Sequence, residues 1–173
     1  EWSNGALFWR FKAASMGIPF IPVRSMLGTD TFKYSGAKLV ECPFTGDRLA
    51  LVPALILDVG IIHVHRADKY GNCQIDGISG FAYELSRASK TLIVSAEEII
   101  PTEEIRRQPD RTIIPYYLVD AVVEAPFASH PGEMCYHYER DEEHLQQWAE
   151  VSKQPETTQA YLDKYNYGVK DHQ

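Results

Sequence analysis

Side chains of several chemical types gather in one short stretch of the sequence. His63 and His65 are followed directly by Arg66, Asp68 and Asn72. The Arg66 guanidinium could bind a phosphate or carboxylate through paired hydrogen bonds. Alternatively, Arg66 and Asp68 could pair with each other or cap the amides of a turn, and Asn72 follows a glycine as in a turn with positive φ. The stretch therefore predicts either an anion-binding loop or a self-contained turn.

The two histidines are also candidate metal ligands. Because alternate residues of a strand point to the same face, the rings of His63 and His65 should share one face. A zinc ion would need further ligands, for which the sequence offers only the distant Cys135 or His130. We therefore expect no bound metal. One histidine should lie in the core, hydrogen-bonded to the backbone, and the other at the end of the sheet.

Two further groups could take part in chemistry. Glu97 and Glu98 form a carboxylate pair that could serve acid–base catalysis, or that could cap the helical turn around Thr102. Ser129 and His130 belong to a loop with a proline at each end. Neither pattern is specific by itself.

These residues need a scaffold, and the hydrophobic pattern predicts one. Leu55–Val64 is almost entirely aliphatic and rich in β-branched residues, which favours a strand buried on both faces in a parallel sheet. We expect this strand to end at a loop that begins with His65. Ser79–Ser89 has helical spacing of apolar residues, and Thr91–Ala96 is a second short strand. A strand, a helix and a strand in that order link parallel strands. The sequence therefore predicts an α/β fold, with an open, mainly parallel sheet flanked by helices.

The other predicted elements surround this sheet. Ser3 or Asn4 should cap a first helix, and Arg24–Tyr34 should form a polar loop. This loop is either an exposed connection or a lid in which Arg24 and Ser25 face an anion. The remaining predicted elements are a helix over Gly5–Met16, an extended segment over Ile18–Val23, a hairpin of Leu39–Phe44 with Leu49–Val52, a short strand over Cys73–Ile75, a third parallel strand over Leu118–Ala125, and helices over Asp141–Ser152 and Thr157–Tyr165.

A common edge should bring the polar segments together. In a parallel sheet, the loops that follow successive strands emerge on the same side. We therefore expect the segments after Val23, Val64, Ala96 and Ala125 to converge on one site.

The composition sets limits on partners and location. The 173 residues carry a formal net charge of −7, which argues against nucleic acid or an anionic membrane surface as a partner. No apolar run reaches the roughly 18 residues of a membrane span, and no signal peptide is recognisable. Cys42, Cys73 and Cys135 are far apart and odd in number, as expected for reduced thiols. We therefore expect a cytoplasmic protein.

Several short motifs, in order along nearly the whole chain, resemble one enzyme family. They are Glu1-Trp2-Ser3-Asn4, Gly17-Ile18-Pro19-Phe20-Ile21-Pro22, Arg24-Ser25-Met26-Leu27-Gly28-Thr29-Asp30, Glu41-Cys42-Pro43-Phe44-Thr45-Gly46, His63-x-x-Arg66-Ala67-Asp68-x-x-Gly71-Asn72 and Ser129-His130-Pro131. With these motifs the sequence resembles the A (alpha) subunit of family I CoA-transferases, of the glutaconate CoA-transferase type.

The resemblance implies a division of labour between subunits. Residues 1–173 would be the C-terminal portion of the A subunit domain, with a helical tail at about 141–173 and an earlier glycine-rich segment missing from this piece. Coenzyme A would be a substrate rather than a permanently bound cofactor, and the other substrates an acyl-CoA and a carboxylic acid. The nucleophilic glutamate would belong to a B subunit, so this chain would form a wall of the cleft and be inactive alone.

The resemblance and the expected common edge together predict which residues contact the substrates. We expect the acyl and CoA cleft to be lined by Ser3, Arg24, Ser25, Gly28, Thr29, His65, Arg66, Asp68, Asn72, Ser129 and His130.

Other functions remain open on the sequence alone. Some relatives of the family are hydrolases of CoA thioesters that use a glutamate of the A subunit, for which Glu1 is the candidate here. A carboxylate just before a helix is equally an ordinary capping charge. The chain could also be a small-molecule-binding effector domain of a regulator, or a scaffold that only builds an interface, because fold alone does not decide function.

Overall fold

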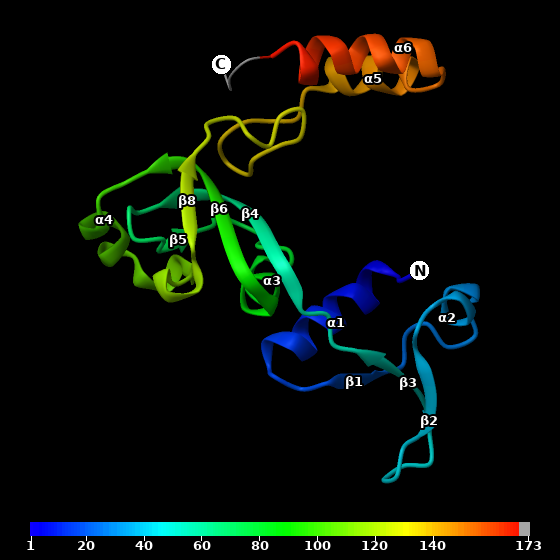
Figure 1. Ribbon diagram of the computed structural model, residues 1–173. Coiled ribbons are helices and arrows are strands. Elements are labelled where there is room, and N and C mark those ends of the chain that lie inside the picture. Colours follow the sequence, from blue (N-terminus) through cyan, green and yellow to red (C-terminus); the bar gives the residue numbers. More distant parts are fainter. Residues whose placement is uncertain (170–173) are drawn as a thin grey trace.

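The computed structural model describes residues 1–169, and its main feature is a five-stranded sheet (Figure 1). The strand order is β7-β5-β4-β6-β8. Strands β4, β6 and β8 run parallel, whereas β5 pairs antiparallel with β4 and β7. The predicted α/β fold with the aliphatic segment in the middle strand is therefore confirmed, in a mixed sheet. The bounds are β4 (Leu57–Ala67), β5 (Cys73–Gln74), β6 (Ser89–Ile99), β7 (Thr112–Ile114) and β8 (Ala121–Glu124).

Strand β4 runs further than the sequence pattern predicts. It continues through His65 and Arg66, so the prediction of a loop from His65 onward is wrong. The physical reason is pairing, because Arg66 lies opposite Gln74 and Ala67 opposite Cys73 of β5. The backbone of Arg66 and Ala67 is therefore paired in the sheet, although the hydrophobic run ends before these residues.

Strand β6 is also longer than predicted. It includes Glu97 and Glu98, so the prediction that they cap the turn at Thr102 is wrong. Glu98 lies opposite Arg66 in the ladder with β4. The helix that follows, α4 (Thr102–Arg107), begins at Pro101 without a side-chain cap.

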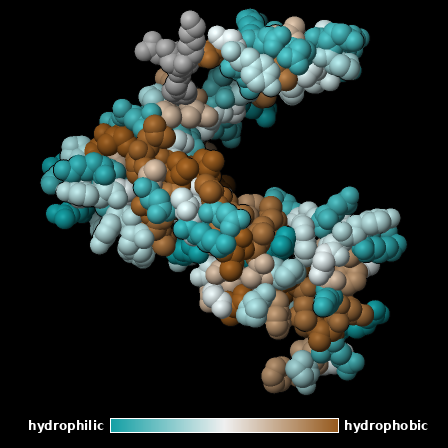
Figure 2. All heavy atoms as spheres, viewed as in Figure 1, coloured by the Kyte–Doolittle hydropathy of each residue, from teal (hydrophilic) through white to brown (hydrophobic). Residues whose placement is uncertain are grey.

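The two faces of the sheet differ in burial. Val64 and Leu92 are buried in a cluster that includes α3 (Ala82–Ala88). On the opposite face, Val59 and Ile61 of β4 are 51% and 71% exposed. The prediction of burial on both faces is therefore wrong for the first half of β4, because no element among residues 1–169 covers it. Figure 2 shows a band of hydrophobic residues over this sheet.

A smaller antiparallel sheet, ordered β1-β3-β2, is formed by the first third of the chain. The predicted hairpin and first helix are confirmed, and Ser3 is the helix cap, since its Oγ accepts a hydrogen bond from the Ala6 N–H at 3.2 Å. A short helix occurs where a polar loop is predicted, and Thr29 starts it by accepting a hydrogen bond from the Phe32 N–H. These elements are α1 (Asn4–Ser15), β1 (Phe20–Val23), α2 (Asp30–Tyr34), β2 (Lys38–Glu41) and β3 (Arg48–Pro53).

Helix α1 joins the two sheets. Phe8 and Phe11 each lie 6.0 Å, between ring centroids, from Phe81 beside α3. Lys12 forms an ion pair with Glu84 of α3 at 3.1 Å. Because β3 leads almost directly into β4, the small sheet lies at the amino end of β4, away from the carboxyl ends of the parallel strands (Figure 1).

The C-terminal part is helical, and none of it is long enough to cross a membrane. Asp141 caps α5 (Glu142–Val151) as predicted, and α6 (Pro155–Leu162) packs against it. Residues 170–173 of the predicted tail lie outside the described residues. Among the helices of residues 1–169, none is both long and apolar enough to span a bilayer.

Burial at Leu92 supplies a test of the core. We expect Leu92→Ala to lower the free energy of unfolding by about 2–5 kcal/mol, because it deletes a side chain that is 1% exposed. Ile61→Ala, on the same sheet but 71% exposed, is the control and should change it by less than about 0.5 kcal/mol. Urea unfolding followed by circular dichroism measures both. Equal losses would contradict the assignment of the buried face.

Candidate functional site

A buried carboxylate organises the carboxyl ends of the parallel strands. Glu97, near the end of β6, is only 8% exposed and accepts three hydrogen bonds. The Tyr138 hydroxyl donates to its Oε1 at 2.5 Å and His63 Nε2 at 2.7 Å, while the Phe127 N–H donates to Oε2 at 2.7 Å. Burial by itself raises the pKa of Glu97, but these hydrogen bonds outweigh it and bring the pKa below its ordinary value. Glu97 is therefore an ionised carboxylate near the carboxyl end of β6.

This carboxylate fixes the proton positions on His63. An ionised carboxylate only accepts hydrogen bonds, so His63 Nε2 carries a proton. In the neutral ring, Nδ1 then accepts a hydrogen bond from the hydroxyl of Ser95, 2.9 Å away. Ser95 is the neighbour of His63 in the ladder between β4 and β6 and lies two residues before Glu97 on the same face.

The order hydroxyl, imidazole, carboxylate is that of an activated nucleophile. Acyl transfer to such a hydroxyl also needs backbone N–H donors aimed at the oxyanion. Ser95 is on a strand with β4 on one side and β8 on the other, so the backbone donors around it are taken up by the sheet. Ser95, His63 and Glu97 therefore form a supporting network rather than a complete nucleophilic site.

What the network supports is the loop over residues 126–132. Phe127 has a positive φ of 59°, a strained conformation for this residue type, and its N–H is held by Glu97. Tyr138, whose pKa is raised by burial and by Glu97, donates to Glu97 and accepts the Ser129 N–H at 3.1 Å. His130 lies next to Ser129, with its Nε2 3.0 Å from Asp141. Glu97 thus positions the backbone that presents Ser129 and His130.

His65 is a structural residue in this arrangement. It is 2% exposed, and both ring nitrogens bind backbone groups, the Cys135 carbonyl at 2.7 Å and the Asp76 N–H at 3.1 Å. The prediction of one core histidine bonded to the backbone is confirmed for His65. With both nitrogens in use, His65 is unsuited to bind a substrate or a metal directly.

Arg66 and Asp68 each have other partners. Arg66 binds Asp76 at 2.8 Å, so the interpretation that it pairs with Asp68 is wrong. Asp68 instead accepts hydrogen bonds from the Tyr70 and Asn72 N–H groups and from the Asn72 side chain, which confirms the alternative of a capped turn. Burial raises the pKa of Asp68, but the hydrogen bonds from Asn72 and its neighbours bring it below the ordinary value.

The predicted residues near the start of the chain form a second group. Trp2 packs against the core cluster of the small sheet together with Val23 and Met26, which brings Glu1 and Ser3 toward the segment that begins at Arg24. The other predicted members, Ser25, Gly28 and Thr29, lie in this same segment before α2.

Arg24 is already paired in this group. Its guanidinium binds Asp47 at 2.6 Å, with the two side chains 72% and 44% exposed, so the pair contributes little stability. The hydrogen bonds from Arg24 and Thr45 hold the pKa of Asp47 below its ordinary value.

The two groups do not converge. The segment after β1 belongs to the small sheet at the amino end of β4, whereas the segments after β4, β6 and β8 lie at the other end (Figure 1). The prediction that all four meet at one edge is therefore wrong, because β1 pairs with β3 and not with the parallel strands. Residues 126–132 and the turn at Asp68–Asn72 do share the carboxyl end.

Among residues 1–169, one group of side chains has the spacing of metal ligands. His130, Asp141 and His144 each offer an atom, and these atoms lie within 4.8 Å of one another. Asp141 already caps α5, and His144 already binds the Tyr161 hydroxyl. Our expectation of no bound metal remains a prediction.

Two residues of this network, Tyr138 and Ser95, are not among those predicted from the sequence. Tyr138 contacts Glu97 across 41 residues of sequence, from a segment without periodicity, so no local signal indicates it. Ser95 could have been found, because its spacing of two from Glu97 places both side chains on one face of a strand.

The charge of Glu97 gives a testable pH dependence. We expect Glu97→Gln to lower the free energy of unfolding by roughly 2–3 kcal/mol near pH 7, because an amide cannot accept all three hydrogen bonds. The folded-state pKa of Glu97 is depressed, so its stabilisation is present above the unfolded pKa of about 4.3 and is lost as pH falls through the folded value. The deficit of the variant should therefore shrink in acid.

Denaturant unfolding at several pH values between about 3 and 7 measures this. The exposed neighbour Glu98→Gln is the matched control. A deficit for Glu97→Gln that stays constant with pH would contradict the ionised assignment.

Comparisons with known proteins agree with the resemblance seen in the sequence. Residues 1–125 match the family model of coenzyme A transferase. The A subunit of 3-oxoadipate CoA-transferase from Pseudomonas knackmussii is 36% identical over 172 residues, which is 99% of this chain and 60% of that protein. The cholesterol ring-cleaving hydrolase IpdA subunit from Rhodococcus jostii is 32% identical over 181 residues, covering 99% of this chain and 61% of that protein.

A solved structure supports the same relationship. Glutaconate CoA-transferase from Acidaminococcus fermentans superposes with a TM-score of 0.91 at 33% identity, covering 99% of this chain and 59% of that chain. The chain spans between 38% and 61% of the length of the curated relatives that it matches. Because the family model matches well over half of its residues, this chain belongs to the coenzyme A transferase family.

Proposed function

We propose that the chain is part of the A subunit of an enzyme that moves coenzyme A from an acyl-CoA to a carboxylic acid, in a cleft shared with a B subunit. The observation that carries the proposal is the match to glutaconate CoA-transferase over 99% of the chain with a TM-score of 0.91. Relatives named as A subunits of glutaconate and 3-oxoadipate CoA-transferases, at 33% and 36% identity, support the same activity.

The proposed chemistry passes through covalent intermediates. In the B subunit, a glutamate carboxylate attacks the thioester carbonyl and expels the CoA thiolate, which leaves a mixed anhydride. The thiolate then attacks the glutamyl carbonyl, releases the first carboxylic acid and forms a glutamyl-CoA thioester. The acceptor carboxylate repeats the sequence in reverse, so one difficult exchange is divided into easier acyl transfers.

This chain would hold and orient substrates. The segment from Arg24 to Thr29 is a candidate wall because Met26 has a positive φ of 75°, and strained backbone of this kind gathers at functional sites. An exposed guanidinium at Arg24 could exchange Asp47 for a substrate carboxylate or phosphate. At the opposite end of β4, the loop that bears Ser129 and His130, fixed by Glu97, would contact a separate part of the substrates.

We propose the cytoplasm as the location. Cys42, Cys73 and Cys135 are all free, with Cys135 exposed, as expected in a reducing compartment.

A second candidate is hydrolysis of a CoA thioester, favoured by one observation. Glu1 is an exposed carboxylate two residues before the Ser3 cap, at the positive end of α1. The similarity to the cholesterol ring-cleaving hydrolase IpdA subunit points in the same direction. In this case Glu1 would activate water or be the nucleophile itself.

One assay separates the two activities. The complete enzyme with its B subunit is given an acyl-CoA with and without a carboxylic acid acceptor, and both new acyl-CoA and free thiol are measured. Transfer predicts acyl-CoA formation that requires the acceptor and is reduced less than about tenfold by Glu1→Gln. The 173-residue chain alone should be inactive. Acceptor-independent thiol release that falls by about a hundredfold or more in Glu1→Gln would instead establish hydrolysis.

A further inference from the structure

One long side of strand β4 has no neighbouring strand among residues 1–169. On its other side, β4 pairs with β6 from Leu57 to Ala67. On this side, β5 pairs only with Arg66 and Ala67, and the sheet order places no further strand there. No backbone hydrogen bond joins residues 57–65 to a turn or loop of the described part of the chain. We call this side of residues 57–65 the open edge of β4.

The register of the sheet shows which backbone groups point to the open edge. Leu92 of β6 accepts a hydrogen bond from the Asp120 N–H, on the β8 side. Because alternate residues of a strand direct their N–H and C=O groups to opposite sides, Ile93 faces β4. Ile93 lies opposite Ile61 and bonds, in a parallel ladder, to the residues before and after it. The groups that point to the open edge are therefore the N–H and C=O of Val59, Ile61 and His63.

The open edge lacks the features that normally protect an exposed strand. A row of unpaired N–H and C=O groups is a template for another strand, so natural proteins shorten, charge or cover such edges. The outermost strands of this sheet are short, since β7 and β8 have three and four residues. The open edge is longer and mainly aliphatic, and it contains one carboxylate, Asp58, but no lysine or proline. Covering by another strand is the protection that remains.

A groove runs beside the open edge, with apolar walls on both sides. Its volume is about 430 Å³. Phe81 and Leu85 line it on the α3 side, and Met134 and Cys135 line it on the other, where the Cys135 carbonyl binds His65. Side chains of an extended strand point alternately to two sides. The groove therefore suits an extended segment with apolar side chains on both of its faces.

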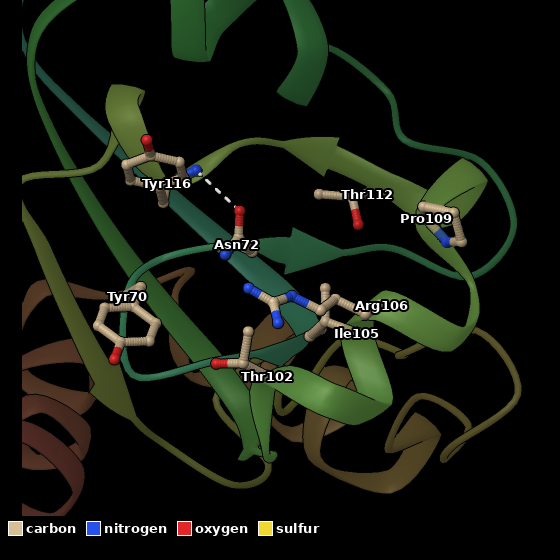
Figure 3. Close-up of a pocket in the computed structure, with 8 residues that line it drawn as sticks. All are labelled: Tyr70, Asn72, Thr102, Ile105, Arg106, Pro109, Thr112 and Tyr116. Carbon is tan, nitrogen blue, oxygen red and sulfur yellow. Dashed lines mark hydrogen bonds between the residues drawn. The ribbon is translucent and has the colours of Figure 1, made fainter.

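The groove is bounded where β5 begins to pair with β4. Beyond His65, the place beside β4 is taken by Cys73 and Gln74. Asn72, directly before β5, accepts the Tyr116 N–H at 3.2 Å, which ties β5 to the segment after β7 (Figure 3). A strand in the groove would therefore lie beside residues 57–65 and end before β5.

We propose that an extended, apolar strand of the same protein, from outside residues 1–173, fills this groove and pairs with Val59, Ile61 and His63. A strand of the same chain loses only the entropy of closing a loop, whereas a separate molecule also loses translational and rotational freedom. This chain spans 60% and 61% of two curated relatives, so those proteins have polypeptide beyond the part that it matches. The proposal goes beyond CoA transfer, because it uses only backbone pairing and apolar contact.

Hydrogen exchange of the complete protein, resolved to single amides, tests the pairing. We expect the amides of Val59, Ile61 and His63 to be protected about a hundredfold or more, as strongly as the amide of Ile62. Ile62 is the internal control, because its N–H points to β6 whether or not the groove is filled. Fast exchange at Val59, Ile61 and His63 beside a protected Ile62 would overturn the proposal.

Photo-crosslinking identifies what fills the groove. Ile78 lines the groove and is 89% exposed, so benzoylphenylalanine can replace it without disturbing the core. In the complete protein, we expect a crosslink to a peptide of the same chain outside residues 1–173. Tyr117→benzoylphenylalanine is the control, because Tyr117 is 71% exposed and does not line the groove, and it should not give this crosslink.

Two crosslinking results would contradict the proposed source of the strand. They are a crosslink from position 78 to a second copy of this chain and a crosslink to a B subunit. Neither measurement requires catalysis, so a complete protein that transfers no CoA would still decide the proposal. Normal transfer with an unprotected open edge would remove this inference and leave the proposed function intact.

Discussion

In the parallel register between β4 and β6, His63 lies opposite Ser95, and Arg66 lies opposite Glu98. Because side chains alternate along a strand, this register also sets Glu97 on the same face as Ser95, within reach of the His63 ring at 2.7 Å. A slip of one residue would turn these groups to the other face of the sheet. The position of the Glu97 carboxylate, and with it the loop at Phe127 and Ser129, therefore depends on this pairing.

The site residues fall into two regions because the chain builds two sheets. The small antiparallel sheet carries the group around Arg24, and the parallel strands carry the loop of Ser129 and His130 at their carboxyl ends. Helix α1 holds the sheets together through Phe8, Phe11 and the ion pair of Lys12 with Glu84. Val59 and Ile61 form an apolar face of this sheet that no described residue covers.

Local patterns in the sequence are enough to predict the helices and strands, but not which side chains from separate segments contact one another. The aliphatic run predicts the middle strand, and Ser3 and Asp141 predict the helix starts, because capping acts over three residues. The partners of Glu97 and Arg66 could not be predicted, because Tyr138 and Asp76 come from separate segments that only the fold brings near. The extension of β4 past Val64 depends on pairing with β5, and hydrophobic periodicity does not reveal this pairing.

We propose that this chain contributes to a CoA-transferring cleft without carrying the nucleophile. The most direct test is mass spectrometry of the complete enzyme after brief incubation with acyl-CoA and no acceptor, with peptide mapping of the covalent adduct. We expect a CoA thioester on a glutamate of the B subunit, with no adduct on any peptide of this chain. A thioester or acyl adduct on Glu1, or turnover without any covalent adduct, would contradict the proposal.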